Sequence, residues 1–329
     1  MSDELERIRA IRKRAAVELR SFPNVSGIGV GYKYVGGQRT DRIVITVYVR
    51  KKLPPAELDP GAKIPAEIEG VPTDVIEVGK VSVRPRAASI NSPPYEVRVL
   101  GSPGPGRFST LIGGIWIMRH LSIYFGTMGA VFVDRKTRQA VILSNDHVLP
   151  GPAGFQVRQP GIEEDHDVIG RIHRLRFDPA RGIDAATAIL NCPRDYSEGE
   201  VRGIGRLRGF AAPRLGTTLT KSGAHSGVTS AEVTAVDVEH EVDYRPERPE
   251  TVMHDVFVLD GGTGPGDSGS IWIDSDLRAV GLNFAGRDQS WIFPFIHALA
   301  IATPMQTVAE AMELELGWDT AATQFMLLL

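Results

Sequence analysis

The chain of 329 residues contains a single cysteine, Cys192, which excludes an intramolecular disulfide framework. It also lacks an N-terminal signal-peptide pattern, because residues 1–20 are charged throughout. Both absences predict a reducing, cytoplasmic location. Cys192 precedes a proline and has no histidine near it in the sequence, so we interpret it as a small structural residue rather than a nucleophile.

Long apolar runs and an excess of charge of one sign are also missing. The longest apolar run, residues 291–302, contains proline and histidine and is too short for a membrane span, which needs about 20 residues. The formal net charge is only -3, which provides no general electrostatic attraction for nucleic acid or an anionic membrane. We therefore expect neither as a partner.

Glycine and proline are abundant, with 35 and 22 residues, and this favours short strands joined by loops. We expect a mainly β protein made of two units, or of one large β domain with an appendage. Composition shifts predict an N-terminal helix at 1–22, a small α/β unit at 23–79, a Pro/Gly-rich linker at 80–109, a β domain at 110–317 and a C-terminal tail at 318–329.

Two features of the N-terminal part support this division. Residues 3–20 begin with acidic side chains and contain no glycine or proline, which predicts a helix. Its apolar stripe is narrow, and two uses remain open: docking on the next domain or self-association. Residues 25–34 and 42–49 are rich in β-branched and aromatic residues, which predicts a pair of strands.

A glycine-rich loop, Gly264-Pro-Gly-Asp-Ser-Gly-Ser270, contains the strongest candidate for chemistry. Gly266 and Gly269 allow a tight backbone around Ser268, so that its hydroxyl and nearby amides can face a substrate. Ser268 is therefore a candidate nucleophile. The alternative is a structural turn, because Gly-Pro-Gly is an ordinary turn sequence.

Two further residues are suited to assist a nucleophile. His147 follows the apolar residues 140–143, and an imidazole at a strand exit can reach a cleft as a general base. Asp184 precedes the apolar residues 185–190, where a buried carboxylate needs a cationic or hydrogen-bonding partner. The alternatives are a loop histidine and a turn aspartate. Asp178, which precedes a proline, fits the turn interpretation better than Asp184 does.

The chain order histidine, aspartate, serine differs from that of α/β-hydrolases and of subtilisin-like enzymes. Ser144–Leu149, Asp184–Ala186 and Gly266–Ser270 resemble the three triad segments of trypsin-like serine proteases over residues 110–317. A closer resemblance is to bacterial proteins similar to the plant narrow-leaf-type protease family. It also rests on Gly129–Asp134, Gln159–Gly161, Val168–Arg171, Lys221–Gly223 and the region from Val25 to Glu77.

This resemblance implies a trypsin-like double β-barrel with a small N-terminal α/β unit and helices at both ends. Pro304–Leu316 is the expected C-terminal helix, with Thr303 as its N-cap. His147 would accept the proton of Ser268, and Asp184 would orient the imidazole. The amides of Gly266 and Ser268 would bind the oxyanion. No metal or cofactor is expected.

Substrate preference depends on the residues beside the serine. In the resembling family the specificity pocket begins six residues before the serine, which is Gly262 here, so a preference for basic side chains is not expected. Phe284, Ala285 and Gly286 would pair with an extended protein or peptide substrate. We expect a small or apolar side chain at the cleaved position.

Three matters remain open from the sequence. Homo-oligomers could form through the N-terminal helix or the apolar tail. A protease-fold binding or scaffold protein is an alternative function, as is an effector held inactive by residues 1–77 and the linker until a partner binds. No Ile-Val-Gly-Gly-like start is present, so Asp267 cannot be assigned a salt bridge to a new terminus, and activation would depend on loop ordering or assembly.

Overall fold

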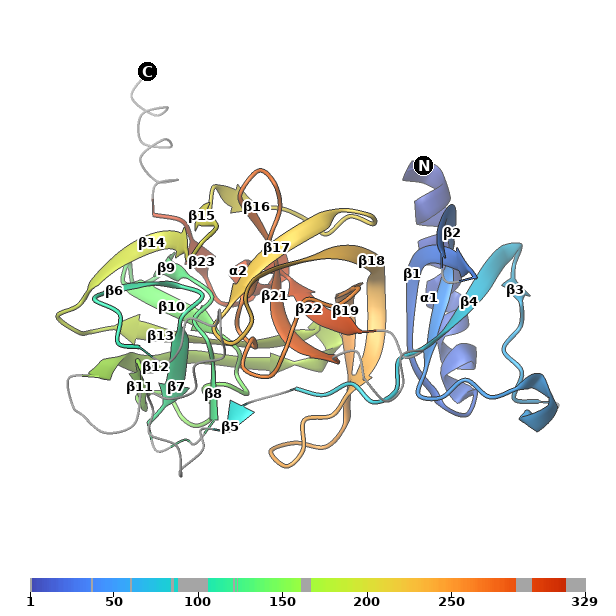
Figure 1. The fold of residues 1–329 in the computed structure, drawn as a ribbon, viewed down its shortest axis with the longest axis horizontal. Coiled ribbons are helices and arrows are strands. Elements are labelled where there is room, and N and C mark those ends of the chain that lie inside the picture. Colours follow the sequence, from blue (N-terminus) through green and yellow to red (C-terminus); the bar gives the residue numbers. More distant parts are fainter. Residues whose placement is uncertain are drawn as a thin grey trace, which may run out of the picture.

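The computed structural model describes residues 2–36, 38–59, 61–83, 86–87, 106–120, 122, 124–160, 167–287 and 298–317. The tail predicted at 318–329 and most of the predicted linker lie outside these residues. Within them, no helix is long and apolar enough to cross a membrane. The described part is mainly β, with two large barrel-like sheets side by side (Figure 1). The expected double-barrel fold class is thereby confirmed.

The N-terminal unit consists of one helix and the strands that it covers. Its elements are α1 (Ser2–Ser21), β1 (Val25–Val35), β2 (Gln38–Val49), the 3-10 helix η1 (Pro55–Glu57), β3 (Glu67–Ile68) and β4 (Val71–Glu77). The predicted helix and the antiparallel strand pair are both present. The strands also continue a larger sheet, because β1 pairs with β18 of the second barrel.

The first barrel contains the segment with His147 and Asp184. Its elements are β5 (Arg86–Ala87), β6 (Thr110–Gly113), β7 (Trp116–Arg119), β8 (Tyr124–Thr127), β9 (Val131–Asp134), β10 (Ala140–Ser144), β11 (Gln156–Arg158), β12 (Val168–Asp178), the 3-10 helix η3 (Pro179–Arg181), β13 (Ile183–Leu190), β14 (Asp195–Val201), β15 (Gly205–Arg206) and β23 (Leu314–Glu315). Gly114, at a φ of 82°, turns the chain between β6 and β7.

The second barrel contains the Ser268 loop. Its elements are β16 (Gly209–Phe210), β17 (Thr218–Gly223), β18 (Gly227–Val242), β19 (Thr251–Leu259), β20 (Ile271–Ile273), β21 (Arg278–Arg287), β22 (Leu299–Pro304) and α2 (Met305–Ala311). The strands follow the order β17-β20-β21-β22-β19-β18, and β17 pairs with β18, which closes the barrel.

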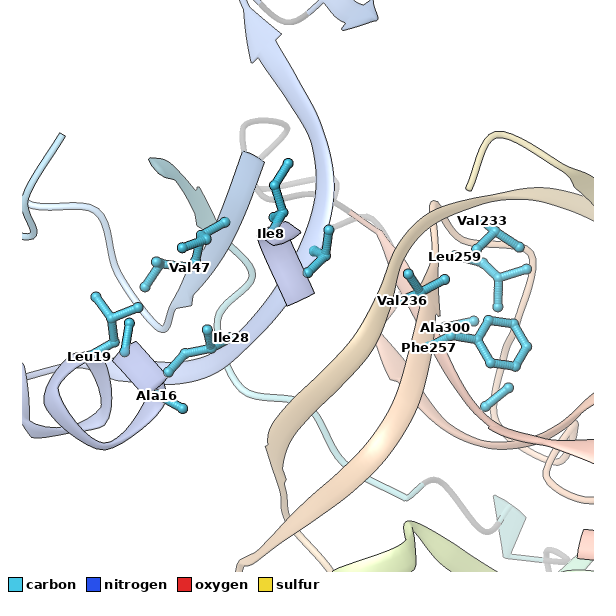
Figure 2. Packing of buried hydrophobic residues seen from close by; sticks show 14 of the residues in the cluster. Ile8, Ala16, Leu19, Ile28, Val47, Val233, Val236, Phe257, Leu259 and Ala300 are labelled. Carbon is cyan, nitrogen blue, oxygen red and sulfur yellow. The ribbon is translucent and has the colours of Figure 1, made fainter. Parts of the chain in front are cut away.

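One hydrophobic cluster extends from the N-terminal unit into the second barrel. Figure 2 shows Ile8, Leu19 and Ile28 of the unit on one side, and Val236 and Phe257 of the barrel on the other. Ion pairs add to this junction, among them one between Arg9 and Asp237 with an N–O distance of 2.5 Å. The unit is thus packed as part of the second barrel's sheet rather than as a separate lobe.

The C-terminal helix is shorter than predicted. It ends at Ala311, because Glu313 adopts a φ of 57° and the chain then forms β23 against β9. Thr303 lies in β22 and does not cap the helix; its hydroxyl donates a hydrogen bond of 2.5 Å to the carbonyl oxygen of Gly182. The apolar side chains of Met312 and Leu316 are buried nonetheless.

Candidate active site

His147 and Asp184 form a buried pair in the first barrel. β10 and β13 run antiparallel with Ser144 opposite Ala186, which brings the histidine after one strand close to the aspartate within the other. His147 Nδ1 lies 2.6 Å from Asp184 Oδ2, and the His147 amide donates to Asp184 Oδ1 at 3.2 Å. The side chains are 3% and 0% exposed. The strand register alone therefore explains why these two residues meet.

This arrangement leaves one imidazole nitrogen ready to accept a proton. Burial favours a raised pKa for Asp184, but the charge and hydrogen bonds of His147 outweigh it and hold the pKa below its ordinary value. Because Nδ1 faces the Asp184 carboxylate and donates its proton to it, the lone pair of a neutral imidazole here would lie on Nε2. Nε2 is buried and has no hydrogen-bond partner within the described chain.

Several neighbours of this pair were not anticipated from the sequence. Asn145 Nδ2 donates to the carbonyl oxygen of Asp184 at 2.6 Å. Tyr244, buried between β18 and β19, presents its ring edge-on to His147 with centroids 6.2 Å apart. Arg248 from the same turn pairs with Asp146. Tyr244 and Arg248 come from a distant part of the chain, so no local pattern could have indicated them, whereas Asn145 lies within the segment Ser144–Leu149.

The Ser268 loop connects β19 to β20 and docks on the first barrel. Gly266 and Gly269 adopt φ values of 96° and 95°, which favour glycine, as expected from the sequence. The Thr127 amide donates to the carbonyl oxygen of Ser268 at 2.7 Å, and the Thr127 hydroxyl donates to that of Gly266 at 2.9 Å. Ser144 Oγ in turn donates to the Thr127 carbonyl oxygen at 2.8 Å. Thr127 thus joins the loop to the strand that precedes His147.

Lys221 and Asp267 form a second buried pair behind this loop. Lys221 Nζ lies 2.8 Å from Asp267 Oδ2, and both side chains are 0% exposed. Ser226 donates to the carboxylate through its hydroxyl at 2.6 Å and its amide at 3.0 Å, and the Gly264 amide donates at 2.9 Å. The partner of Asp267 is therefore an internal lysine of β17.

Charge and burial act against each other in this pair. Burial lowers the pKa of Lys221, and Asp267 offsets only part of this shift. Burial would raise the pKa of Asp267, but Lys221 and Ser226 hold it below the ordinary carboxyl value. The sequence offered one signal for this pair: an aspartate in a loop packed around a nucleophile needs a cation nearby.

Two loop amides remain available for a ligand. The amides of Asp267, Gly269 and Ser270 donate to backbone carbonyl oxygens, at distances of 2.9 to 3.0 Å. No such partner exists for the amides of Gly266 and Ser268 among the residues that the structure describes. These are the two donors that the sequence assigned to an oxyanion.

The hydroxyl of Ser268 is not bonded to His147 in this structure. Ser268 Oγ donates to the carbonyl oxygen of Phe284 at 3.3 Å, while His147 Nε2 has no partner. Val148, the residue after His147, and Ser268 both flank Gly126 of β8, because a Cβ placed on Gly126 would lie 2.6 Å from the Val148 side chain and 2.8 Å from the Ser268 carbonyl oxygen. A rotation about χ1 of Ser268 would redirect its hydroxyl.

A pocket of about 420 Å³ adjoins the loop, and Gly262, His225 and Arg287 are among its lining residues. Gly262 has a φ of 74°, and a Cβ there would lie 3.0 Å from the Trp272 ring. No carboxylate lines the pocket within the described chain. Phe284 and Ala285 are buried, whereas the Gly286 amide donates to the carbonyl oxygen of Ser82 at 3.2 Å.

No protein-family model matches the chain, and no curated protein matches it. Solved structures similar to it include Nocardiopsis protease (NAPase), with 18% identity, a TM-score of 0.48 and coverage of 63% of this chain and 98% of that chain. Cellulomonas bogoriensis chymotrypsin has 17% identity, a TM-score of 0.47 and the same coverage. A glutamic acid specific serine protease, described as using a histidine triad in substrate binding, has 20% identity, a TM-score of 0.49 and coverage of 63% and 100%. The similarity to the narrow-leaf-type family stays a prediction.

Proposed function

We propose that this chain is a serine endopeptidase that cleaves peptide bonds through His147, Asp184 and Ser268. The observation that carries this proposal is the buried His147–Asp184 pair, whose unpartnered Nε2 lies in the barrel against which the Ser268 loop docks. A buried acceptor without a donor is uncommon in folded proteins, and a general base needs such a lone pair.

The reaction would proceed in two halves. Ser268 Oγ attacks the substrate carbonyl carbon while its proton passes to His147 Nε2, and the amides of Gly266 and Ser268 stabilise the resulting oxyanion. The C–N bond then breaks, and His147 donates the proton to the leaving amine. Water, deprotonated by His147, next attacks the ester carbon and releases Ser268 Oγ, which recovers the proton.

A fluorophosphonate probe tests this proposal, since it reacts with activated serines. We expect wild-type protein to be labelled at Ser268 and the Ser268→Ala variant to remain unlabelled, because the alanine has no nucleophile. Ser230→Ala, which removes an exposed hydroxyl of β18, is the matched control and should label like wild type. If no oligomeric form of the wild type is labelled, the proposal that this chain is a serine endopeptidase is wrong.

One observation favours the alternative of a protease-fold binding or scaffold protein: the Ser268 hydroxyl faces Phe284 rather than His147. The same probe separates the two functions, because a pure binding protein is not labelled. The preference for a small or apolar side chain over a basic one rests on Gly262. A proteome-derived peptide library, compared between wild type and Ser268→Ala, would test it.

A further inference from the structure

Two described parts of the predicted linker pair with strands on both sides of the Ser268 loop. Ser82 forms an antiparallel bridge with Gly286 of β21 and accepts the hydrogen bond from its amide. β5 pairs antiparallel with β8, with Arg86 opposite Phe125. Figure 1 shows the cyan chain leaving the N-terminal unit below the second barrel, and β5 beside β8. We call residues 80–83 and 86–87 the linker segment.

The nucleophile lies between these two pairings. On one side, Ser268 Oγ donates to the carbonyl oxygen of Phe284, two residues before Gly286. On the other side, Thr127, two residues after Phe125, donates its amide to the carbonyl oxygen of Ser268. Four residue steps separate Ser82 from Arg86, which an extended chain covers in about 13 Å. The two described parts of the linker segment thus lie on opposite sides of the nucleophile.

The first part of the linker segment is held firmly. Val81 and Val83 are buried in the same hydrophobic cluster as Phe284 and Ala285. The Asp243 amide donates to the carbonyl oxygen of Val81 at 3.0 Å, and the Val83 amide donates to that of Asp243 at 3.2 Å.

Side chains add to this attachment. Lys80 Nζ lies 2.6 Å from Asp243 Oδ2, and Arg287 Nη1 donates to the carbonyl oxygen of Val78 at 2.8 Å. The start of the linker segment is therefore bridged through Ser82 to Asp243 on one side and to Gly286 of β21 on the other.

The amide of Gly286 is the donor that an extended peptide would use. β22 pairs with one side of β21 along residues 281–287, whereas the pairing with β20 on the other side stops at Leu282. The open edge next to Ser268 can bind a peptide backbone by β-addition. One amide cannot donate fully to Ser82 and to a substrate at the same time.

We infer that the linker segment occupies the peptide-binding cleft in the manner of an extended substrate, so that a protein substrate must displace it. This inference rests on the proposed function and names the regulation of the same site. It assigns the inhibitory contact to residues 80–83 and 86–87 of this chain. Displacement of these residues, rather than removal of the whole N-terminal unit, is then the activating event.

Two probes and one double variant test the inference. Val81→Ser/Val83→Ser weakens the packing of the linker segment. A peptidyl phosphonate must pair with β21 to reach Ser268, whereas a short alkyl fluorophosphonate needs only the hydroxyl. If the cleft is free in a tenth of the wild-type molecules or fewer, freeing it in all molecules raises the rate at least about tenfold. We therefore expect the double variant to react about tenfold faster than wild type with the peptidyl probe. Its alkyl rate should change little.

The matched control is Val17→Ser/Val35→Ser, which alters two valines that are 72% and 61% exposed. It should react with both probes like wild type. Lys80→Gln, which removes only the ion pair with Asp243, should give a smaller acceleration. It keeps the inference testable if the double variant fails to fold, as judged by its thermal unfolding.

A binding measurement on the Ser268→Ala background does not depend on activity. A fluorescent peptide with the sequence of residues 79–88 should bind the double variant at least about tenfold more tightly than the protein with an unaltered linker. Alkyl labelling with equal peptidyl rates in both proteins would overturn the inference while leaving the proposed function intact. If no probe labels any protein, the proposed function is wrong, and the peptide-binding measurement alone tests the inference. Equal peptide affinities of the double variant and of the protein with an unaltered linker would then overturn it.

Discussion

Asp184 in the first barrel and Asp267 in the second are both fully buried but are held in different ways. Asp267 in the second barrel accepts from Lys221, Ser226 and the Gly264 amide, and this pair leaves no atom in need of a partner within the described chain. Asp184 in the first barrel accepts from His147, whose Nε2 remains without one. We call Lys221–Asp267 the closed pair, because its hydrogen bonds are complete and it fixes a loop. We call His147–Asp184 the open pair, because Nε2 of His147 can still exchange a proton.

The difference has a physical basis. A buried ion pair with complete hydrogen bonding is costly to break but has no capacity for chemistry. A buried pair with an unfilled acceptor gives up some stability and keeps a site for a proton. Perturbing each pair in turn should therefore affect different quantities: reactivity for Asp184 and stability for Asp267.

Asp184→Asn should produce the largest effect. The amide cannot hold the imidazole with its proton on Nδ1 as a carboxylate does, so the alkyl fluorophosphonate labelling rate should fall about 10³- to 10⁴-fold. Asp178→Asn in the same barrel is the control and should label normally. Normal labelling of Asp184→Asn would show that the open pair does not activate Ser268.

Lys221→Met should mainly reduce stability. It leaves Asp267 buried without its cation, and the loss in free energy of unfolding should be about 3–5 kcal/mol. Urea denaturation measures this loss. Arg278→Met removes the ion pairs of a 42% exposed arginine with Asp274 and Asp276 and should cost no more than about 1 kcal/mol. Equal losses in the two variants would remove the distinction between a closed pair and a surface pair.

The closed pair should also make the free energy of unfolding depend on pH in the acid range. The pKa of Asp267 is lowered in the folded protein, so its contribution to stability is complete above the ordinary carboxyl pKa of about 3.9 and is lost as the pH falls through the folded value. The free energy of unfolding of the wild type should decrease from about pH 5 towards pH 2.

The slope of this decrease distinguishes the variants. Lys221→Met, in which Asp267 has no cation, should lose stability less steeply over the same pH range, whereas Arg278→Met should follow the wild type. Identical slopes in all three proteins, measured by urea denaturation at each pH, would contradict the assignment of the acid-sensitive contribution to the Lys221–Asp267 pair.

Much of the fold followed from local patterns. The helix at residues 3–20 and the strands at 25–34 and 42–49 have strong periodicity or β-branched content, and they occur as predicted. The predicted C-terminal helix was too long, because the apolar spacing continues past Ala311. The turn at Glu313 is set by the pairing of β23 with β9. Propensity could not indicate that long-range pairing.

In the candidate site too, local patterns indicated some residues, whereas long-range contacts decided the others. His147, Asp184 and Ser268 were named from residue type, order and the glycines around the serine. Lys221, Tyr244 and Arg248 were given no role, because each acts on a residue far away in the sequence and has an ordinary local environment. The linker at 80–109 was predicted from its composition, yet composition does not say against which strand a segment pairs.

By itself, the sequence determined the mainly β class and the glycines that shape the Ser268 loop, and it supplied the three residues that we propose for acyl transfer, because these depend on local chemistry. Only the tertiary structure decided which aspartate is closed and which is open, and that Ser82 pairs with Gly286 at the edge of the cleft. Burial and strand pairing join residues that are far apart in the chain, and the free energy of such contacts depends on that juxtaposition rather than on the residues taken singly.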